Sequence, residues 1–263
     1  MSHDTVVRPT TTDTAPTILI TGASRGIGAA IAERFYAEGA SLSLASRTEL
    51  EVDRSYASER CMRSDVDVRD VTALKDLVHR TEARFGAIDV LINNAGIDEP
   101  VALADLSLEH LHEVMAVNFY SAVMLTRFVA VGMMRRRHGR VISISSIAGK
   151  EGSPHHVAYV SSKHALIGFT KCAARELVQH GITVNAVCPG LIDTDMLRGF
   201  FAAYGAQTGL GADAELETML SRTPSGQLGS PDDVASLVVF LASAGAQNIV
   251  GQAMNTDGGM LQW

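Results

Sequence analysis

Short apolar runs alternate with longer amphipathic stretches along most of the chain. Helical spacing of apolar residues begins near Gly26, Asp70, Asp105, Glu113, Val157 and Pro231. Seven short apolar and β-branched runs predict buried strands, and these are Thr17–Thr21, Ser41–Ser46, Arg60–Ser64, Ile88–Asn93, Gly139–Ser145, Thr183–Cys188 and Gln252–Asn255. The alternation of strand and helix predicts an α/β fold in which helices cover both faces of a doubly wound parallel seven-stranded sheet.

The length of the chain and its first residues fit a single domain. A chain of 263 residues suits one α/β domain, and we find neither a repeat nor a linker that divides it. Residues 1–15 are rich in Thr and Asp and lack the apolar region of a secretory signal. We therefore expect a disordered tail over residues 1–15 and one folded domain over residues 16–263.

Composition argues against several classes of protein. A net charge of −7 disfavours a nucleic-acid partner, because phosphate binding requires clustered cations. The basic run Arg135–Arg137 ends an expected helix, where its charge suits the helix dipole. Three cysteines without a Cys-x-x-Cys pair indicate a reducing, cytoplasmic compartment, and nine histidines without zinc spacing predict no metal site. No apolar run looks long enough to cross a membrane.

A glycine-rich turn separates the first strand from the first helix. Gly22, Gly26 and Gly28 follow the apolar run Ile18–Ile20 and precede a helical pattern. Glycines in this context let the backbone approach a diphosphate, which the N–H groups at the helix N-terminus then bind. The alternative is a purely structural glycine loop. The context favours dinucleotide binding and a Rossmann-type fold.

Tyr159 and Lys163 lie four residues apart on an expected helix, so both side chains share one face. A nearby cation favours the phenolate and predicts a lowered pKa for Tyr159, which then exchanges protons near neutral pH. Surface helices often carry Tyr-x-x-x-Lys by chance, and the pattern alone is weak evidence. Together with the glycine turn it indicates an oxidoreductase.

Six motifs occur in the order and spacing seen in short-chain dehydrogenase/reductases. They are Thr21-Gly22-x-x-x-Gly26-x-Gly28, Asn93-Asn94-Ala95-Gly96, Asn118, Ser146, Tyr159-x-x-x-Lys163 and Pro189-Gly190. The chain resembles this family from about Pro16 to Met260. Within the family, Gly149–Gly152, Ser162–Ala165, Gly168–Lys171 and Gly181–Gly190 look most like ketoreductases of bacterial aromatic polyketide pathways, followed by 3-oxoacyl-carrier-protein reductases.

The resemblance implies roles for four residues. Tyr159 is the expected general acid, Lys163 is expected to lower its pKa and bind the nicotinamide ribose, and Ser146 is expected to polarise the substrate carbonyl. Ser145 is the alternative to Ser146. Asn118, which lies in an otherwise apolar helix, is expected to order a water that relays protons to Lys163; the alternative is bonding between the helix and nearby backbone.

The end of the second strand predicts the cofactor. In proteins that bind NAD, an acidic residue at the end of this strand binds the adenosine ribose. Here the strand ends in Ser46 and Arg47 instead, and Arg25 adds a second cation. We therefore expect NADP(H), with a solvated Arg47 as the alternative. By resemblance, the cofactor contacts are Gly22, Ser24, Arg25, Gly26, Ile27, Gly28, Ser46, Arg47, Asp65, Val66, Asn93, Ala95, Gly96, Tyr159, Lys163, Pro189, Gly190, Ile192 and Thr194.

Residues 194–223 are expected to form a lid over the substrate. Phe200, Phe201 and Tyr204 suit a large, flat, apolar substrate, and several glycines loosen the segment. The alternative is ordinary packing against the core. His155 and His156 precede the Tyr159 helix and are expected at the rim of the substrate site. With Ser146, these five residues are the predicted substrate contacts.

Two departures from the family pattern are visible. The chain between Arg47 and Asp65 is short, which predicts a clipped helix over about Glu49–Ala57. Ile97–Pro100 has the sequence Ile-Asp-Glu-Pro where the polyketide ketoreductases have a Pro-Gly-Gly run. This second departure leaves the identity and facial selectivity of the substrate open.

Three functions remain open at this point. The first is NADPH-dependent reduction of a carbonyl on a polycyclic aromatic polyketide or a carrier-bound 3-oxoacyl intermediate. The second is reduction of an anthraquinone-type ring to its hydroquinone, which then serves a partner enzyme. The third is a non-catalytic NADP(H)-binding regulator. The long apolar helices Asp105–Arg137 and Val157–His180 predict a homotetramer, in which resemblance places the tail Gly258–Trp263 against a neighbour.

Overall fold

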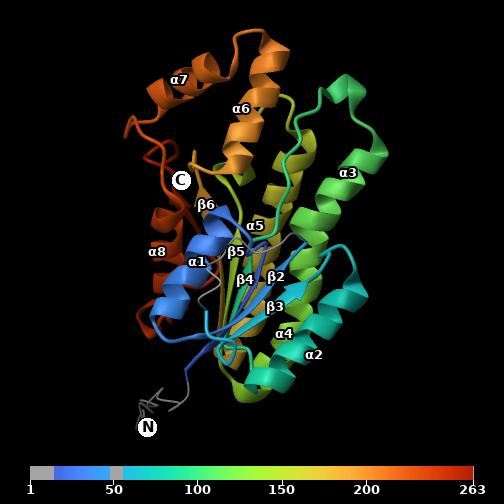
Figure 1. The fold of residues 1–263 in the computed structure, drawn as a ribbon, viewed down its shortest axis with the longest axis vertical. Coiled ribbons are helices and arrows are strands. Elements are labelled where there is room, and N and C mark those ends of the chain that lie inside the picture. Colours follow the sequence, from blue (N-terminus) through green and yellow to red (C-terminus); the bar gives the residue numbers. More distant parts are fainter. Residues whose placement is uncertain (1–14, 48–55, 263) are drawn as a thin grey trace, which may run out of the picture.

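A computed structural model describes residues 15–47 and 56–262 (Figure 1). Its centre is one parallel sheet with the strand order β3-β2-β1-β4-β5-β6-β7. The strands are β1 (Thr17–Thr21), β2 (Ser41–Ser46), β3 (Cys61–Asp65), β4 (Val90–Asn93), β5 (Gly139–Ile144), β6 (Ile182–Pro189) and β7 (Ala253–Thr256). The predicted doubly wound parallel sheet of seven strands is confirmed. The first two strands have the predicted bounds, and the others differ by one or two residues at one or both ends.

Helices cover both faces of this sheet (Figure 1). They are α1 (Gly26–Ala37), α2 (Val71–Phe85), α3 (Leu108–Met115), α4 (Ser121–Arg136), α5 (Val157–Leu177), α6 (Asp195–Thr208), α7 (Ala212–Arg222) and α8 (Pro231–Ala242). Helices α1 and α8 pack together on one face, while α2, α4 and α5 lie on the other. Helices α6 and α7 pack against each other beyond the carboxyl ends of the strands (Figure 1).

The alternation of side chains along β1 explains why both faces need helices. Ile18 and Ile20 belong to the apolar core under α1 and α8, whereas Leu19 belongs to the core under α2 and α4. All five residues of this strand are buried. A strand buried on both faces has the near-continuous apolar sequence that the chain shows here.

Local signals start several helices where the sequence predicts. The Asp70 side chain accepts hydrogen bonds from the first turn of α2. Ser230 and Asp233 form a capping box at α8, and Pro231 occupies its first turn.

The expected start of a helix near Asp105 is wrong. A short 3₁₀ turn ends at Asp105, and α3 begins only after Ser107, whose side chain accepts a bond from the His110 N–H. Between α3 and α4 the residues Ala116–Tyr120 form a π-helical turn, so one nearly continuous helix runs from Leu108 to Arg136. Side-chain capping by Ser107 outcompetes the earlier acidic start that Asp105 offers.

The helix Leu108–Arg136 corrects a second expectation. Among the described residues, this one stretch is long and apolar enough by composition to span a membrane. Half of its most apolar window is buried inside the protein, against α2, α5 and the sheet. Core helices of this kind often pass the same test of length and hydropathy, so the stretch is weak evidence for a membrane span.

Two predictions fall largely outside the described residues. The expected tail covers 1–15, of which the structure describes Ala15 alone. The expected clipped helix covers 49–57, of which the structure describes Tyr56 and Ala57, and neither residue is helical.

Candidate active site

The glycine turn forms a tight cradle with the end of β4. The Asn94 side chain donates hydrogen bonds to the carbonyl oxygens of Thr21 (3.1 Å) and Gly22 (2.9 Å). A Cβ on Gly22 would lie 2.8 Å from the Ala95 Cα, and Gly22 has a positive φ of 64°. A Cβ on Gly28 would lie 2.2 Å from the Gly22 carbonyl oxygen. Any larger side chain would fill this space, which we call the glycine cradle (Gly22, Gly26 and Gly28).

The N-terminus of α1 fits a diphosphate. Arg25 is its N-cap and makes no side-chain cap bond, and no acidic residue occupies the first turn. The N–H groups of Gly26, Ile27 and Gly28 therefore lack a side-chain acceptor from the cap, and the positive end of the helix dipole lies with them. Ser24, also predicted as a contact, is buried in the same turn.

The segment after β6 closes the cradle from the opposite side. Gly190 donates to the Thr256 carbonyl oxygen (3.1 Å), and a Cβ on Gly190 would lie 2.8 Å from Asp257. Ile192 is buried, and Thr194 caps α6 while its methyl group lies 3.3 Å from the position of a Gly26 Cβ. The predicted contacts Pro189 to Thr194 therefore lie at the same strand edge as the glycine cradle.

The end of β2 carries a cationic edge. Ser46 is buried beside the exposed Arg47, and the Val66 N–H donates to the Ser46 carbonyl oxygen (3.0 Å). The exposed Asp65 lies next to Ser46 in the strand register. This edge offers an exposed guanidinium and a hydroxyl, the donors that a ribose 2′-phosphate requires, so the residues fit NADP(H).

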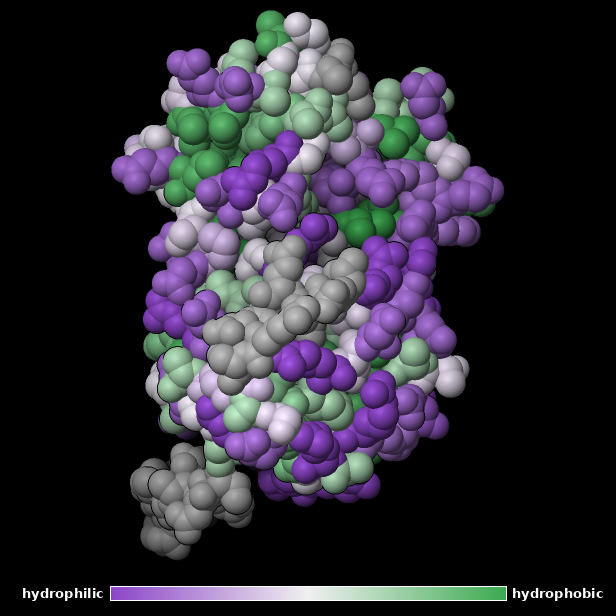
Figure 2. Space-filling model, viewed as in Figure 1, coloured by the Kyte–Doolittle hydropathy of each residue, from purple (hydrophilic) through white to green (hydrophobic). Residues whose placement is uncertain are grey.

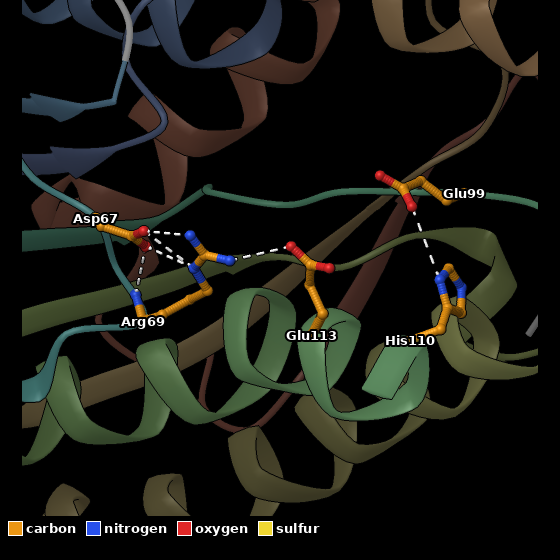
Figure 3. A network of polar contacts seen from close by, with 5 residues as sticks. All are labelled: Asp67, Arg69, Glu99, His110 and Glu113. Carbon is orange, nitrogen blue, oxygen red and sulfur yellow. Dashed lines mark hydrogen bonds and ion pairs between the residues drawn. The ribbon is translucent and has the colours of Figure 1, made fainter. Parts of the chain in front are cut away.

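Sequence analysis missed the network beside that edge (Figure 3). Arg69 contacts Asp67 and also binds Glu113 of α3 at 3.0 Å. The hydrogen bond from Arg69, with a smaller contribution from Arg47, holds the pKa of Asp67 below its ordinary value. Arg69 thus partly neutralises Asp67, an acid whose pKa Arg47 also lowers. The sequence offered one hint, the Asp-Val-Arg spacing just after β3.

Ser146, Tyr159 and Lys163 meet below the glycine cradle. The Lys163 Nζ donates to the Ile144 carbonyl oxygen (2.9 Å) and lies 5.5 Å from the centre of the Tyr159 ring. Tyr159 also has a side-chain hydrogen bond with Ser146. Ser145, the alternative to Ser146, donates instead to the Lys163 carbonyl oxygen (3.2 Å) and is buried. The geometry favours Ser146 as the hydroxyl that faces the phenol.

The expected lowering of the Tyr159 pKa is wrong for this structure. Burial raises the pKa of Tyr159 well above its ordinary value, and the Asp98 charge raises it further, while the Ser146 bond opposes both. Burial also lowers the pKa of Lys163 to about 8, because few polar groups replace its water. Desolvation outweighs the attraction between phenolate and ammonium, so Tyr159 holds its proton at neutral pH. A protonated phenol is the state that donates a proton.

Asn118 lies in the π-helical turn and ties three elements together. Its Oδ1 accepts from the Ile97 N–H (2.8 Å), and its Nδ2 donates to the Ile97 carbonyl oxygen (2.9 Å) and to the Ser162 Oγ (3.0 Å). The Asn118 Oδ1 and the Lys163 Nζ would each lie 3.5 Å from a Cβ on Gly96. Bonding to backbone, the alternative reading of Asn118, is therefore observed. The role in ordering a water stays a prediction. π-turns often occur at functional sites.

The five predicted aromatic and histidine contacts gather at the opening of this site. Phe200 lies 5.0 Å from His156 and 4.8 Å from Phe201 between ring centres, and it stacks on Tyr204 at 5.5 Å. His155 lies 6.1 Å from Tyr204 and has a positive φ of 65°. We call His155, His156, Phe200, Phe201 and Tyr204 the aromatic wall. Phe201 itself is buried and packs as core.

Asp98 is the main residue of the site that sequence analysis left without a role. Its side chain is 12% exposed, and one carboxylate oxygen lies 3.6 Å from the His156 Nε2. The charge of Asp98 acts on both Tyr159 and Lys163. The sequence showed Asp98 as part of a departure from the family pattern, but the fold was needed to bring it to Tyr159.

Comparison with known proteins agrees with this geometry. The family described as enoyl-(acyl carrier protein) reductase matches residues 22–261. A Streptomyces virginiae protein named as a ketoacyl reductase of the monensin polyketide synthase is 38% identical over 95% of this chain and 98% of its own. The Escherichia coli 3-oxoacyl-[acyl-carrier-protein] reductase FabG is 36% identical over 92% of this chain and 96% of its own.

A solved structure shares the whole architecture. A variant of the actinorhodin polyketide ketoreductase with NADPH has a TM-score of 0.89 and 35% identity, over 95% of this chain and 98% of that chain. The strand order, the glycine cradle and the site around Tyr159 agree with membership in the same family as these relatives. The chain belongs to the short-chain dehydrogenase/reductase family and is an oxidoreductase of the ketoreductase type.

Proposed function

We propose that the protein uses NADPH to reduce a carbonyl group on a polycyclic aromatic polyketide or a carrier-bound 3-oxoacyl intermediate. The main support is the buried group of Ser146, Tyr159, Lys163 and Asn118 at the foot of the glycine cradle, which we call the tyrosine cluster. The relatives reported above are named for ketoreduction in the same kinds of pathway.

The tyrosine cluster supplies the proton and the orientation for this reaction. NADPH, when bound, supplies the hydride. The hydroxyl groups of Ser146 and Tyr159 bind the carbonyl oxygen, and Tyr159 donates its proton as negative charge develops there. Lys163 is positively charged below pH 8 and stabilises the phenolate that remains. Asn118 binds the Ile97 backbone and the Ser162 hydroxyl, and thereby ties the loop after β4 to the helix that carries Tyr159 and Lys163.

The cofactor is NADP(H). Arg47 and Ser46 are proposed to bind the 2′-phosphate, and Arg25 lies at the mouth of the glycine cradle, where it pairs with Asp195 across 3.7 Å. Both groups of that pair are exposed, so solvent screens their attraction and Arg25 can turn towards a phosphate at low cost.

The aromatic wall supports a flat apolar substrate. Phe200 and Tyr204 stack on each other and close onto the two histidines before α5. We propose that α6 and α7, which we call the lid, cover the substrate from this side. A quinone ring is as flat as a fused-ring ketone, so quinone reduction is the second candidate. The non-catalytic regulator is wrong, because the chain belongs to a family of oxidoreductases.

Steady-state oxidation of NADPH tests the proposal. The substrates are a fused-ring ketone, an anthraquinone and an acetoacetyl thioester. Each is assayed with the wild type, with Tyr159→Phe and with the matched control Tyr120→Phe, whose ring is exposed on the protein surface. We expect turnover of the ketone by the wild type and by Tyr120→Phe alone. Turnover of the quinone alone would favour the second candidate, and no turnover above the enzyme-free background would contradict both.

We also propose a cytoplasmic homotetramer. The long helix ending in α4 keeps Tyr120 and Val131 about half exposed, and Val178 after α5 is similarly exposed. Apolar residues on the outer faces of two long helices favour contacts with other copies of the chain. Leu261 near the C-terminus is buried, and its N–H binds Asp257 of the same chain. Sedimentation at micromolar concentration is expected to give four chains, and a stable monomer would contradict the proposal.

A further inference from the structure

Two acids on the loop that follows β4 each face a histidine from another segment. Asp98 faces His156 at 3.6 Å, and Glu99 faces His110 of α3 at 3.7 Å (Figure 3 shows the second pair). The pairs differ in exposure: the Asp98 side chain is 12% exposed and that of Glu99 is 64% exposed. Glu99 is an ordinary surface acid, whereas Asp98 is mostly shielded from solvent.

The hydrogen bonds of His156 set the orientation of its ring beside Asp98. The His156 Nδ1 lies 2.7 Å from the Pro154 carbonyl oxygen, which can only accept, so Nδ1 carries a hydrogen. The other ring nitrogen, Nε2, then faces one oxygen of Asp98 at 3.6 Å. Burial raises the pKa of the Asp98 carboxyl group, while the neighbouring charges of His156 and Lys163 act to lower it.

The second oxygen of Asp98 has no such partner. Oδ1 is buried and makes no hydrogen bond within the described residues. A buried carboxylate oxygen without a partner is costly, and native proteins rarely leave one unless it meets a ligand or water. The Asp98 charge raises the pKa of both Tyr159 and Lys163, so Asp98 acts electrostatically on both groups.

The position of Asp98 is fixed from both sides. Asn118 binds Ile97 immediately before it, and the Val101 N–H donates to the His155 carbonyl oxygen (2.7 Å) after it. His156 in turn packs against Phe200 of the aromatic wall. The carboxylate therefore lies between the tyrosine cluster and an apolar wall, where a flat substrate would present the atoms next to its carbonyl group.

We propose that the Asp98 Oδ1 accepts a hydrogen bond from a hydroxyl group of the substrate, and that His156 positions the carboxylate to do so. The substrate class is then a ring ketone that also carries a phenolic or enolic hydroxyl. This inference rests on the proposed function, because it needs a carbonyl substrate beside Tyr159. A site built to bind a hydroxyl rejects an analogue without it, since the buried acceptor then stays unpaired.

Equilibrium binding to the NADP⁺-loaded protein tests the inference without turnover. The probes are the ring-hydroxylated 1-tetralones and their methyl ethers, measured by calorimetry. We expect at least one hydroxyl isomer to bind about ten to a hundred times more tightly than its ether, as for a hydrogen bond to a charged group. Asp98→Asn should reduce this preference and Asp98→Leu should abolish it, whereas the matched Glu99→Gln variant on the same loop should retain it.

The role of His156 has its own test. His156→Phe keeps an aromatic ring against Phe200 but removes the partner of Asp98, so the hydroxyl preference should fall. His156→Gln can still donate to the carboxylate and should restore part of the preference. A purely structural role predicts the reverse order, because Phe resembles the native ring more closely.

Three results would overturn the inference. They are the absence of binding by every hydroxytetralone, equal binding of alcohols and ethers, and a hydroxyl preference that survives Asp98→Leu. Thermal unfolding of each variant shows whether it is folded. Reduction of unsubstituted 1-tetralone tests the proposed function separately. An active enzyme without hydroxyl preference would contradict this inference alone, while an inactive one that prefers hydroxyl ligands would contradict ketoreduction alone.

Discussion

The glycine cradle, which we call the cofactor wall, and the lid, which we call the substrate wall, are held by different kinds of contact. The glycine cradle is closed by backbone, since a Cβ on Gly28 would meet the Gly22 carbonyl oxygen at 2.2 Å. The lid is held by side chains, chiefly the rings of Phe200 and Tyr204 against the two histidines. Leu210 and Met196 of this region are exposed, and Leu216 and Leu220 line an open pocket of about 440 Å³.

This difference separates what is fixed from what can vary. Backbone contacts tolerate almost no change of residue, so the cofactor wall keeps one geometry. Side-chain contacts on an exposed helix pair can be replaced without disturbing the sheet, so the substrate wall can adapt. Figure 2 shows apolar residues gathered over α7 at the top of the molecule, away from the core. Substitutions on the two walls should therefore differ in size and in kind.

The largest effect is expected from Tyr159→Phe, which removes the proton donor and leaves both the glycine cradle and the lid unchanged. The ring and its packing stay, but the proton is lost, so turnover should fall by about 10²–10⁴. NADPH affinity should remain within a few-fold of the wild type, because the glycine cradle is unchanged. Stopped-flow turnover and calorimetric NADPH binding give the two numbers. A quinone should suffer less than a ketone, because its reduced oxygens are more acidic, and near-normal turnover on every substrate would contradict the assignment.

Gly28→Ala attacks the cofactor wall directly. The added methyl group would lie 2.2 Å from the Gly22 carbonyl oxygen and 2.6 Å from the Asn94 Nδ2, so the turn must open. We expect NADPH affinity to fall at least about a hundredfold and the folded state to lose about 3 kcal/mol or more. The matched Gly168→Ala variant on α5, where a Cβ meets nothing within 4 Å, should leave NADPH affinity unchanged and should stabilise the folded state by about 0.5–1 kcal/mol. Normal NADPH binding by Gly28→Ala would mean that the cradle is not the diphosphate site.

The sequence predicts the cofactor wall better than the substrate wall for a physical reason. Tight backbone turns demand glycine, so the cradle leaves visible marks at Gly22, Gly26 and Gly28. The Tyr159 and Lys163 spacing is equally visible, because helix geometry sets it. The sheet follows from apolar periodicity, and the predicted doubly wound parallel sheet of seven strands is confirmed.

What the sequence could not predict depends on contacts between distant segments. The raised pKa of Tyr159 results from burial and from Asp98, which is 61 residues away along the chain. The π-turn carries Asn118, which binds the distant Ile97 loop, and the late start of α3 depends on capping by Ser107. The roles assigned to the site residues, the lid and the tetramer remain predictions until they are measured.

Lys163 links the stability of the tyrosine cluster to pH. The folded chain releases the Lys163 proton near pH 8, whereas the unfolded chain holds it up to its ordinary pKa of 10.5. The unfolded state thus binds more protons between these values, and the stability of the wild type should rise with pH across this window. The Lys163→Met variant lacks this rise, so from pH 8 to 9.5 the wild type should gain about 2 kcal/mol on it.

Urea unfolding at several pH values measures this difference. Lys171→Met, which removes an exposed lysine from the same helix, is the matched control and should follow the wild type in its pH dependence. Below pH 8 the buried charge of Lys163 costs the wild type stability, so the Lys163→Met variant should unfold at equal or higher urea concentration while it loses activity. A constant difference between wild type and variant at all pH values would contradict the lowered pKa.

Arg47→Ala tests the exposed edge of the cofactor wall. A charge-assisted hydrogen bond to the 2′-phosphate contributes about 1.5–3 kcal/mol, so the specificity constant with NADPH should fall about tenfold or more. The constant with NADH, which lacks that phosphate, should stay nearly unchanged. Comparison of the two cofactors on one substrate is therefore its own control. Equal losses with both would indicate that Arg47 acts through folding.

The smallest effect is expected on the lid. Gly199 lies within α6, is exposed, and a Cβ there meets nothing within 4 Å, so Gly199→Ala should stabilise the helix by about 0.5–1 kcal/mol. If the lid opens without unfolding the sheet, this gain slows hydrogen exchange of the α6 amides about two- to five-fold and leaves global unfolding almost unchanged. Gly205→Ala is the matched opposite, since its Cβ would lie 2.5 Å from Gly211 and should speed exchange. Equal shifts in global unfolding and in α6 exchange would mean that the lid moves as part of the core, and the contrast between the two walls would then fail.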